Sequence, residues 1–156
     1  MKAPNEGPLG YWHALISQQY LQLLRRELAH LELDRWYFTL VYLAEAKGPT
    51  TQQQLADELH LDKASMVRAI DHLSAKGYVQ RLQCPNDRRK HHLALLPKAL
   101  PALKEIKEAF RKMNDLAFAN IKASDRKLIM DQLPLMLDRL KQADLAAKAP
   151  TSKTHK

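Results

Sequence analysis

The positively charged side chains of this 156-residue sequence are concentrated in one stretch of the chain. Between Asp62 and His92, seven Lys or Arg stand against three Asp, so this stretch contributes four of the eight net positive charges. Guanidinium and ammonium groups bind phosphate oxygens, and guanidinium groups also pair with guanine edges. A localised positive charge favours a polyanionic partner, although net charge alone does not separate nucleic acid from an anionic membrane surface. The seven cations are Lys63, Arg68, Lys76, Arg81, Arg88, Arg89 and Lys90.

Patterns for metal binding or catalysis are weak in this sequence. Adjacent side chains of a strand point to opposite faces, so His91 and His92 cannot chelate one ion together. We find no nucleophile–base pair, no glycine-rich phosphate loop and no paired carboxylates. The sequence therefore predicts no metal site, no cofactor and no enzymatic activity. The remaining histidines that we considered make no ligand-spaced pair; they are His13, His30, His60 and His72.

The single cysteine, Cys84, excludes an internal disulfide and suits a reducing cytosol. Nearby cations would favour its thiolate, so a redox-active thiol and a passive thiol are both open, with the passive thiol favoured. No apolar run approaches the roughly 18 residues that span a bilayer. Residues 1–9 lack the apolar segment of a signal peptide. We therefore expect a cytoplasmic protein that does not bind membranes.

Aromatic and polar side chains occur together in the first part of the chain. Trp12, His13, Arg35 and Trp36 could form a pocket for a small aromatic or phenolic anion, with His13 or Arg35 meeting its carboxylate. The alternative is that the aromatic residues at helical spacing belong to the core.

Helical periodicity predicts two helices before residue 50. Apolar residues between 11 and 31 recur at steps of three and four, which predicts an amphipathic helix. Asp34 is a plausible N-cap for a second helix, which Gly48-Pro49 ends.

The next segment predicts a helix-turn-helix followed by a hairpin. Thr51 and Gln54 form a capping-box pattern that opens a short helix. After a tight corner, Asp62 caps a helix over 63–76, and Gly77 ends it in a left-handed conformation. Two β-type runs, 78–83 and 91–96, flank the turn sequence Pro85-Asn86-Asp87. A basic hairpin directly after a helix-turn-helix is typical of a wing.

Two further helices are predicted from Pro97 onward. The first continues to Ile121, and Ser124 can cap the last one, which Pro134 should kink or interrupt for one turn. The terminal helices carry more apolar positions than a small winged domain can cover, so we expect two copies to associate through them. The alternative is a monomer whose terminal helices fold back on themselves. The predicted regions are a winged helix-turn-helix over 34–96, dimerisation helices over 9–33 and 97–147, and a disordered basic tail over 148–156.

Residues 54–96 resemble the MarR/SlyA family of transcription regulators. The resemblance rests on Leu55-Ala56-Asp57-Glu58-Leu59, on Asp62-Lys63-Ala64-Ser65-Met66-Val67-Arg68, on Leu73, on Lys76-Gly77-Tyr78-Val79-Gln80-Arg81 and on the wing signature Asp87-Arg88-Arg89. It implies a mostly α fold with a small β wing, and an intertwined homodimer in which the whole chain, 1–156, forms one protomer. It also implies that the recognition helix enters the major groove and that the wing tip reaches the flanking minor groove. Many members bind small aromatic anions that release DNA.

Two features depart from the family pattern. Leu95-Leu96 and Ala99 stand where the family often has Leu-Thr and Gly, and Pro101 follows closely. The long helix is therefore expected to start late or to bend in its first turn. The first helix also lacks the reactive cysteine of the peroxide-sensing branch.

Each residue of the expected DNA interface has an assigned role. Arg68 would read guanine in the major groove, against the alternatives of a solvated arginine or one paired with Asp71. Lys63, Ala64 and Ser65 lie in the first turn of the recognition helix, where side chains face the groove. Thr51 and Gln52 open the supporting helix, whose N-terminus favours phosphate, although Thr51 can equally serve only as a cap.

The wing has its own predicted roles. Arg89 would enter a narrow minor groove, and Asp87 would orient it without touching DNA. Arg81, Arg88 and Lys90 would supply positive charge to the DNA backbone.

The sequence thus predicts a dimeric transcription regulator, with repression expected, that binds a palindromic site in double-stranded DNA. The direction of regulation depends on where that site lies relative to a promoter, and the sequence names neither the site nor an effector. A protein-interaction module whose winged domain does not read DNA is the alternative.

Overall fold

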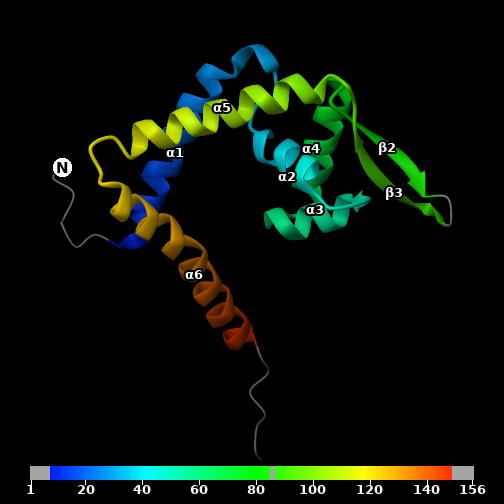
Figure 1. Ribbon diagram of the computed structural model, residues 1–156. Helices are drawn as coiled ribbons and strands as arrows, with labels where there is room; N and C mark the ends of the chain where they lie inside the picture. Colours follow the sequence, from blue (N-terminus) through cyan, green and yellow to red (C-terminus); the bar gives the residue numbers. More distant parts are fainter. Residues whose placement is uncertain (1–7, 85–86, 149–156) are drawn as a thin grey trace, which may run out of the picture. The chain divides into compact units, whose positions relative to one another are not determined.

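The computed structural model describes residues 8–84 and 87–148, with side chains at all of these positions except 84 and 87–90 (Figure 1). The chain forms two compact units, one up to Asn114 and one from Asp115 onward. Within the described residues the fold is mostly helical, with one small antiparallel sheet. The elements are α1 (Leu9–Glu27), η1 (Ala29–Leu31), α2 (Tyr37–Glu45), β1 (Thr50–Thr51), α3 (Gln52–Leu59), α4 (Lys63–Ala75), β2 (Val79–Cys84), β3 (Asp87–Leu95), α5 (Ala99–Ala117) and α6 (Ala123–Lys148).

The core of the first unit is built from the end of α1 and from α2, α3, α4 and α5. Fully buried side chains come from α1, α2, α4 and α5, which makes these helices one packed body. Tyr78, just before β2, donates its hydroxyl to the carbonyl of Leu31 at 2.8 Å, so the start of the hairpin is tied to η1. The residues with no exposed surface include Leu24, Leu40, Met66, Ile70, Leu73 and Ile106.

Helix α2 begins later than the sequence predicts. Asp34 has a left-handed backbone (φ 52°) and no capping role, so its predicted N-cap function is wrong. The helix starts at Tyr37, and its N-cap position, Trp36, makes no side-chain hydrogen bond. Leu33 and Trp36 are both buried, at 1% and 7% exposure, and their burial bends the intervening chain into a turn.

The helix-turn-helix is confirmed together with its local capping interactions. The amide of Gln54 donates to Thr51 Oγ1 (3.2 Å), and the amide of Thr51 donates to Gln54 Oε1 (2.8 Å). Asp62 Oδ1 accepts from the amide of Ser65 at 2.8 Å, which caps α4. Gly77 follows α4 with φ 75°, a conformation that glycine adopts without steric cost.

The sheet has the strand order β1-β3-β2, with both pairs antiparallel. Its third strand, β1, was not predicted; Thr50 pairs with Leu93 and Thr51 with His92. β3 is longer than predicted and begins at Asp87, which pairs with Cys84. Asp87 therefore belongs to a strand, and its predicted place in the turn is wrong because the ladder continues closer to the tip. The rest of the predicted turn, Pro85-Asn86, lies outside the described residues.

Helix α5 starts at Ala99, two residues after Pro97, in agreement with the late start expected from Pro101. The first turn of a helix has no intrahelical partners for its N–H groups, so a proline at the third position forfeits no bond. The helix packs on α1 and α2. Phe110 stacks on Phe38 with ring centroids 5.1 Å apart, and the Tyr20 hydroxyl donates to Asn114 Oδ1 at 3.1 Å. Helix α5 ends at Ala117, before the predicted Ile121.

Helix α6 differs from its prediction at both ends and at its proline. It begins at Ala123, so Ser124 lies inside the first turn and its predicted capping role is wrong. The helix continues through Pro134, so the predicted interruption is wrong, while a kink there stays a prediction. Lys148, predicted as the start of the tail, is the last helical residue, and the remainder of that tail lies outside the described residues.

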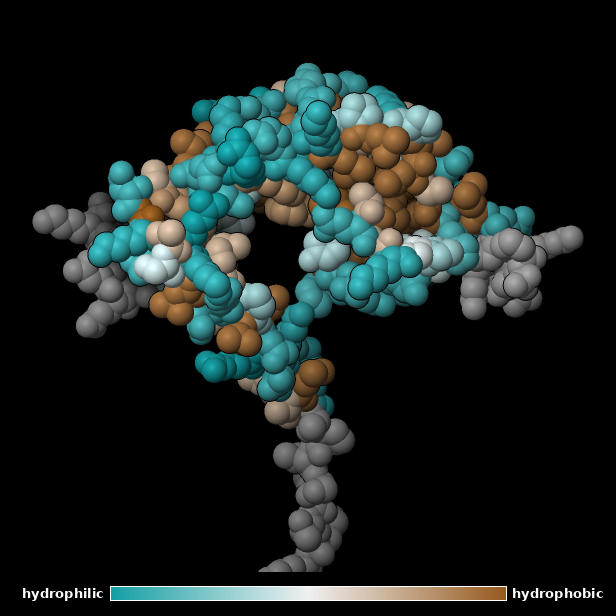
Figure 2. All heavy atoms as spheres, in the orientation of Figure 1, coloured by the Kyte–Doolittle hydropathy of each residue, from teal (hydrophilic) through white to brown (hydrophobic). Residues whose placement is uncertain are grey.

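Large apolar side chains are exposed on both terminal helices. No residue of α6 is buried, and hydrophobic side chains alternate with hydrophilic ones along it (Figure 2). The apolar residues that predicted helix α1 differ in their exposure. Leu24 is buried, whereas Trp12, Leu15 and Ile16 are 40–58% exposed. Among the described residues, no helix is long and apolar enough to cross a membrane. The exposed apolar side chains of α6 include Leu128, Ile129, Leu135, Leu137, Leu140 and Leu145.

Candidate nucleic-acid interface

The N-terminal end of helix α4 has one polar face that is open to solvent. Its buried residues, Met66, Ala69, Ile70 and Leu73, all face the core. The remaining positions of the first two turns are open to solvent. Lys63, Ala64 and Arg68 are exposed, and Ser65 is half-buried. These four are the predicted residues of the recognition helix, and the structure brings them together at one end of it.

Hydrogen bonds fix the position of Arg68 relative to the cap of α4. The Ser65 hydroxyl donates to Asp62 Oδ2 (2.6 Å) and accepts from Arg68 Nη2 (2.9 Å). The Ser65 hydroxyl and amide donors, followed by the positive charge of Arg68, hold the pKa of Asp62 below its ordinary value. Arg68 is thus aligned through Ser65 with an ionised carboxylate, while its other N–H groups remain able to donate a bidentate pair.

Asp71, considered above as a partner of Arg68, pairs instead with the wing. Arg81 on β2 donates from Nη2 to Asp71 Oδ1 at 2.7 Å and to Gln52 Oε1 at 3.2 Å. Arg81 therefore bridges α3, α4 and β2. This contact joins residues 10 and 29 positions apart, and no local sequence signal predicts it.

The N-terminus of α3 lies beside the start of α4. Gln52, Gln53 and Ala56 of α3 line a depression of about 200 Å³ with Lys63 and Met66 of α4. Thr51 is the N-cap of α3, which was the alternative to a phosphate contact considered for this residue. A phosphate contact of Thr51 or Gln52 stays a prediction. A helix N-terminus with an adjacent lysine is suited to a phosphate group.

Apart from Arg81 on β2, the predicted wing residues lie on β3. Asp87, Arg88, Arg89 and Lys90 follow one another on the strand, in the hairpin that extends away from the helices (Figure 1). Their side chains are outside the described part of the structure. The minor-groove role of Arg89 and the orienting role of Asp87 therefore stay predictions.

Two of the four predicted effector residues line a pocket of about 580 Å³ in the first unit. Arg35 and Trp36 lie on its wall, with the Arg35 guanidinium carbon 4.6 Å from the Trp36 ring centroid. Trp12 and His13 do not line it; both are exposed near the start of α1. The other lining residues were not predicted, because they meet only in the folded chain; they include Leu21, Arg25, Phe38, Tyr42, Leu61 and Ser65.

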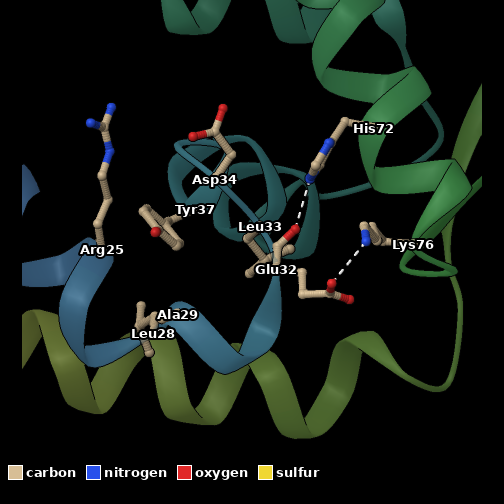
Figure 3. Close-up of a pocket in the computed structure, with 9 residues that line it drawn as sticks. All are labelled: Arg25, Leu28, Ala29, Glu32, Leu33, Asp34, Tyr37, His72 and Lys76. Carbon is tan, nitrogen blue, oxygen red and sulfur yellow. Dashed lines mark hydrogen bonds and ion pairs between the residues drawn. The ribbon is translucent and has the colours of Figure 1, made fainter.

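A second pocket, of about 360 Å³, was also missed by sequence reasoning. Figure 3 shows His72, on α4, and Lys76, the C-cap residue that follows α4, directed toward Glu32. His72 Nε2 lies 2.7 Å from the Glu32 carbonyl oxygen, and Lys76 Nζ lies 3.0 Å from Glu32 Oε1. The hydrogen bond and charge of Lys76 lower the pKa of Glu32. Lys76, one of the seven clustered cations, is therefore used in an ion pair with Glu32.

Among the residues that the structure describes, no three His, Cys, Asp or Glu side chains are grouped in a way that could hold a metal ion.

These elements define a winged helix-turn-helix: α3 and α4 form the two-helix unit, and β2 and β3 form the wing. Residues 37–91 match the family model described as "MarR family". This region of the chain is therefore similar to the MarR family, and the chain has the fold of MarR-family transcription regulators. This confirms the predicted resemblance and the predicted winged helix fold.

Solved structures agree over nearly their whole length. The crystal structure of MarR is 24% identical, with 95% of this chain and 98% of that chain covered and a TM-score of 0.78. The transcriptional regulator SlyA is 19% identical, with 88% and 97% covered and a TM-score of 0.81. MepR of S. aureus, solved as a DNA complex, is 18% identical, with 86% and 99% covered and a TM-score of 0.77.

Proposed function

We propose that this protein is a sequence-specific, double-stranded DNA-binding transcription regulator that acts as a homodimer on a palindromic operator. The observation that carries the proposal is the exposed N-terminal end of α4, where Arg68 is aligned through Ser65 beside Lys63 and Ala64. A recognition helix contacts base edges with its N-terminal residues, which is where these side chains lie. The DNA complex of MepR, which shares the fold, supports the same use of this domain.

In this proposal, Arg68 reads guanine, Ala64 meets a thymine methyl group, and Lys63 binds phosphate. The O–H of Ser65 is donated to Asp62, so Ser65 contacts a base edge as an acceptor through the lone pair that Arg68 does not use, and it contacts phosphate only when its O–H turns away from Asp62. Thr51 and Gln52, at the N-terminus of α3, support a further phosphate contact. On the wing, Arg89 enters the minor groove with Asp87 beside it, and Arg88 and Lys90 add positive charge along the backbone.

The exposed apolar side chains of α1 and α6 support a homodimer. Helix α6 has 26 residues and no buried one, and isolated helices gain little stability without a packed apolar face. Contiguous exposed apolar surface usually marks an interaction site. A twofold-related second copy would cover these side chains and would present two recognition helices to major grooves about 34–36 Å apart.

The pocket beside Arg35 supports regulation by a small aromatic anion. Leu21, Phe38 and Leu61 provide apolar walls, and Arg25 and Arg35 provide positive charge for a carboxylate. Titration of tryptophan fluorescence with benzoate should reveal binding that Arg35→Ala weakens; equal responses of the two proteins would contradict the assignment.

The experiment that tests DNA reading is selection of sites from a random duplex library, followed by affinity measurements on the enriched site. We expect an inverted repeat, and Arg68→Ala should lose about fivefold to a hundredfold of the preference for the correct base. Arg26→Ala, which removes an exposed arginine from α1, is the matched control and should retain the preference.

Enrichment of no sequence would favour the second candidate, a winged-helix protein-interaction module. Such a module would keep its function after substitution of both Arg68 and Arg89 with alanine. As a DNA-binding regulator, and not an enzyme, the protein would act in the cytoplasm, where its operator would lie.

A further inference from the structure

We propose that Arg81 is a positioning residue that holds the wing in register with the recognition helix, and that it does not serve as a DNA contact. This inference rests on the proposed function and assigns a role that differs from the backbone contact expected from the sequence. The observation behind it is the bridge that Arg81 makes to Asp71 and Gln52.

The strand register places Arg81 on the side of the hairpin that faces the helices. Arg81 lies directly opposite Leu93 on β3, and directly opposed residues of an antiparallel pair point to the same face. Leu93 is 7% exposed, and Val79, two residues before Arg81, is 1% exposed. Because side chains alternate along a strand, Val79, Arg81 and Leu93 share the buried face, while Gln80 lies on the other. Arg81 is thus directed toward the helical layer.

The guanidinium of Arg81 joins all three elements of the DNA-binding region. It donates to Asp71, in the middle of α4, and to Gln52, the first residue of α3. Beyond Arg81 on β2, Gln83 is the next residue on the same face, and it is exposed. The bridge therefore lies where the hairpin leaves the helices, and small rotations there move the wing tip by larger distances.

Electrostatics favour the same role. A carboxylate in the middle of a recognition helix repels phosphates, and pairing with Arg81 offsets the charge of Asp71. If Arg81 turned toward the DNA backbone, Asp71 would lose its partner and would stand with an unpaired negative charge near the phosphates. The side chains of Arg81 and Asp71 are 35% and 58% exposed, and exposed ion pairs contribute little to stability. The pair is consequently expected to affect wing placement far more than folding.

The first test uses the sign of the effect of Asp71→Ala on operator affinity in the full-length protein. Removing an acid beside a polyanion strengthens binding if charge alone matters. Under this proposal the substitution weakens binding, because it releases Arg81 and the wing; contacting residues commonly show couplings of about twofold to a hundredfold, and we expect about tenfold here. Glu58→Ala, which removes an exposed acid of α3, is the matched control and should not weaken binding.

The second test uses salt. Loss of a phosphate contact reduces the slope of log affinity against log salt by about one, and Lys63→Ala is expected to show this reduction. Arg81→Ala should weaken binding while its slope stays that of the wild type. Footprinting should show loss of the flanking minor-groove protection in Arg81→Ala, with the major-groove protection retained. Thermal melts of each variant verify that the domain is folded.

The inference is overturned if Asp71→Ala binds as tightly as the wild type or more tightly, or if Arg81→Ala flattens the salt slope as Lys63→Ala does. Either result leaves the proposed function intact, since the wild-type protein would still select an operator. Failure of the wild type to select any sequence would instead contradict the proposed function.

Discussion

At the scale of single residues, the hydroxyl of Ser65 holds two charged side chains, Asp62 and Arg68, in fixed positions relative to each other. It donates to Asp62 and accepts from Arg68, so a helix cap and a candidate base-reading arginine share one oxygen atom. Preorganising an arginine in this way reduces the side-chain entropy lost when it binds a base. Arg68 was identified from the sequence because its motif is local. The role of Ser65 as the link was not identified, because hydroxyl orientation is set by the folded helix.

Asp62 makes the free energy of unfolding depend on pH, and the direction of the change follows from its lowered pKa. Its pKa in the folded protein is lowered from 3.8, chiefly because Ser65 donates two hydrogen bonds to it. A lowered pKa stabilises the folded protein above about pH 4, and this contribution is lost as the pH falls through the folded-state value. Asp62→Asn keeps an acceptor at the cap and removes the titration. We expect its stability to fall less steeply below about pH 4 than that of the wild type, measured by urea unfolding at each pH. Identical acid profiles of the two proteins would contradict this role of Asp62.

At the scale of elements, Thr51 is the residue that caps the first turn of α3. It completes a capping box with Gln54 and is the last residue of β1. Thr51→Ala should lower the free energy of unfolding by about 1 kcal/mol, because an N-cap hydroxyl is lost. Thr50→Ala removes a similar hydroxyl, which donates to the Gly48 carbonyl, and leaves the cap intact. Urea unfolding should therefore show a larger loss for Thr51→Ala than for Thr50→Ala, and equal losses would argue against the cap.

The elements also show which features a sequence can predict. The caps at Thr51 and Asp62 were predicted because donor and acceptor lie within three residues of each other. Asp34 failed as a cap because distant packing buries Leu33 and Trp36 and bends the chain between them. β1 was missed because a two-residue strand exists only through its pairing with β3, about forty residues later. The bridge from Arg81 to Asp71 and Gln52 was missed for the same reason, since strand register decides which way Arg81 points.

At the scale of the whole molecule, the proposed dimer makes the association state sensitive to α6. Leu140 is 64% exposed, so a glutamate there costs the single chain little in folding and would be buried only in a dimer interface. We expect Leu140→Glu to raise the dimer dissociation constant at least about tenfold, since burial of a leucine contributes about 1.5–3 kcal/mol. Sedimentation velocity measures the change, and Gln132→Glu adds the same charge to α6 at an exposed polar position. A dimer as stable in Leu140→Glu as in the control would place the interface elsewhere.

The short strand β1 has a further consequence, because it joins the wing directly to the helix-turn-helix. Thr51 is paired with His92 of β3 and is also the residue on which the first turn of α3 closes. No free linker separates the two, so the ladder cannot open at that end without also releasing the start of the helix. The amide hydrogens of β1 and of the first turn of α3 should therefore exchange with solvent in a single cooperative opening. In mechanical terms, the wing and α3 are joined at Thr51 without a linker, so we expect a displacement of β3 to move the start of the helix as well.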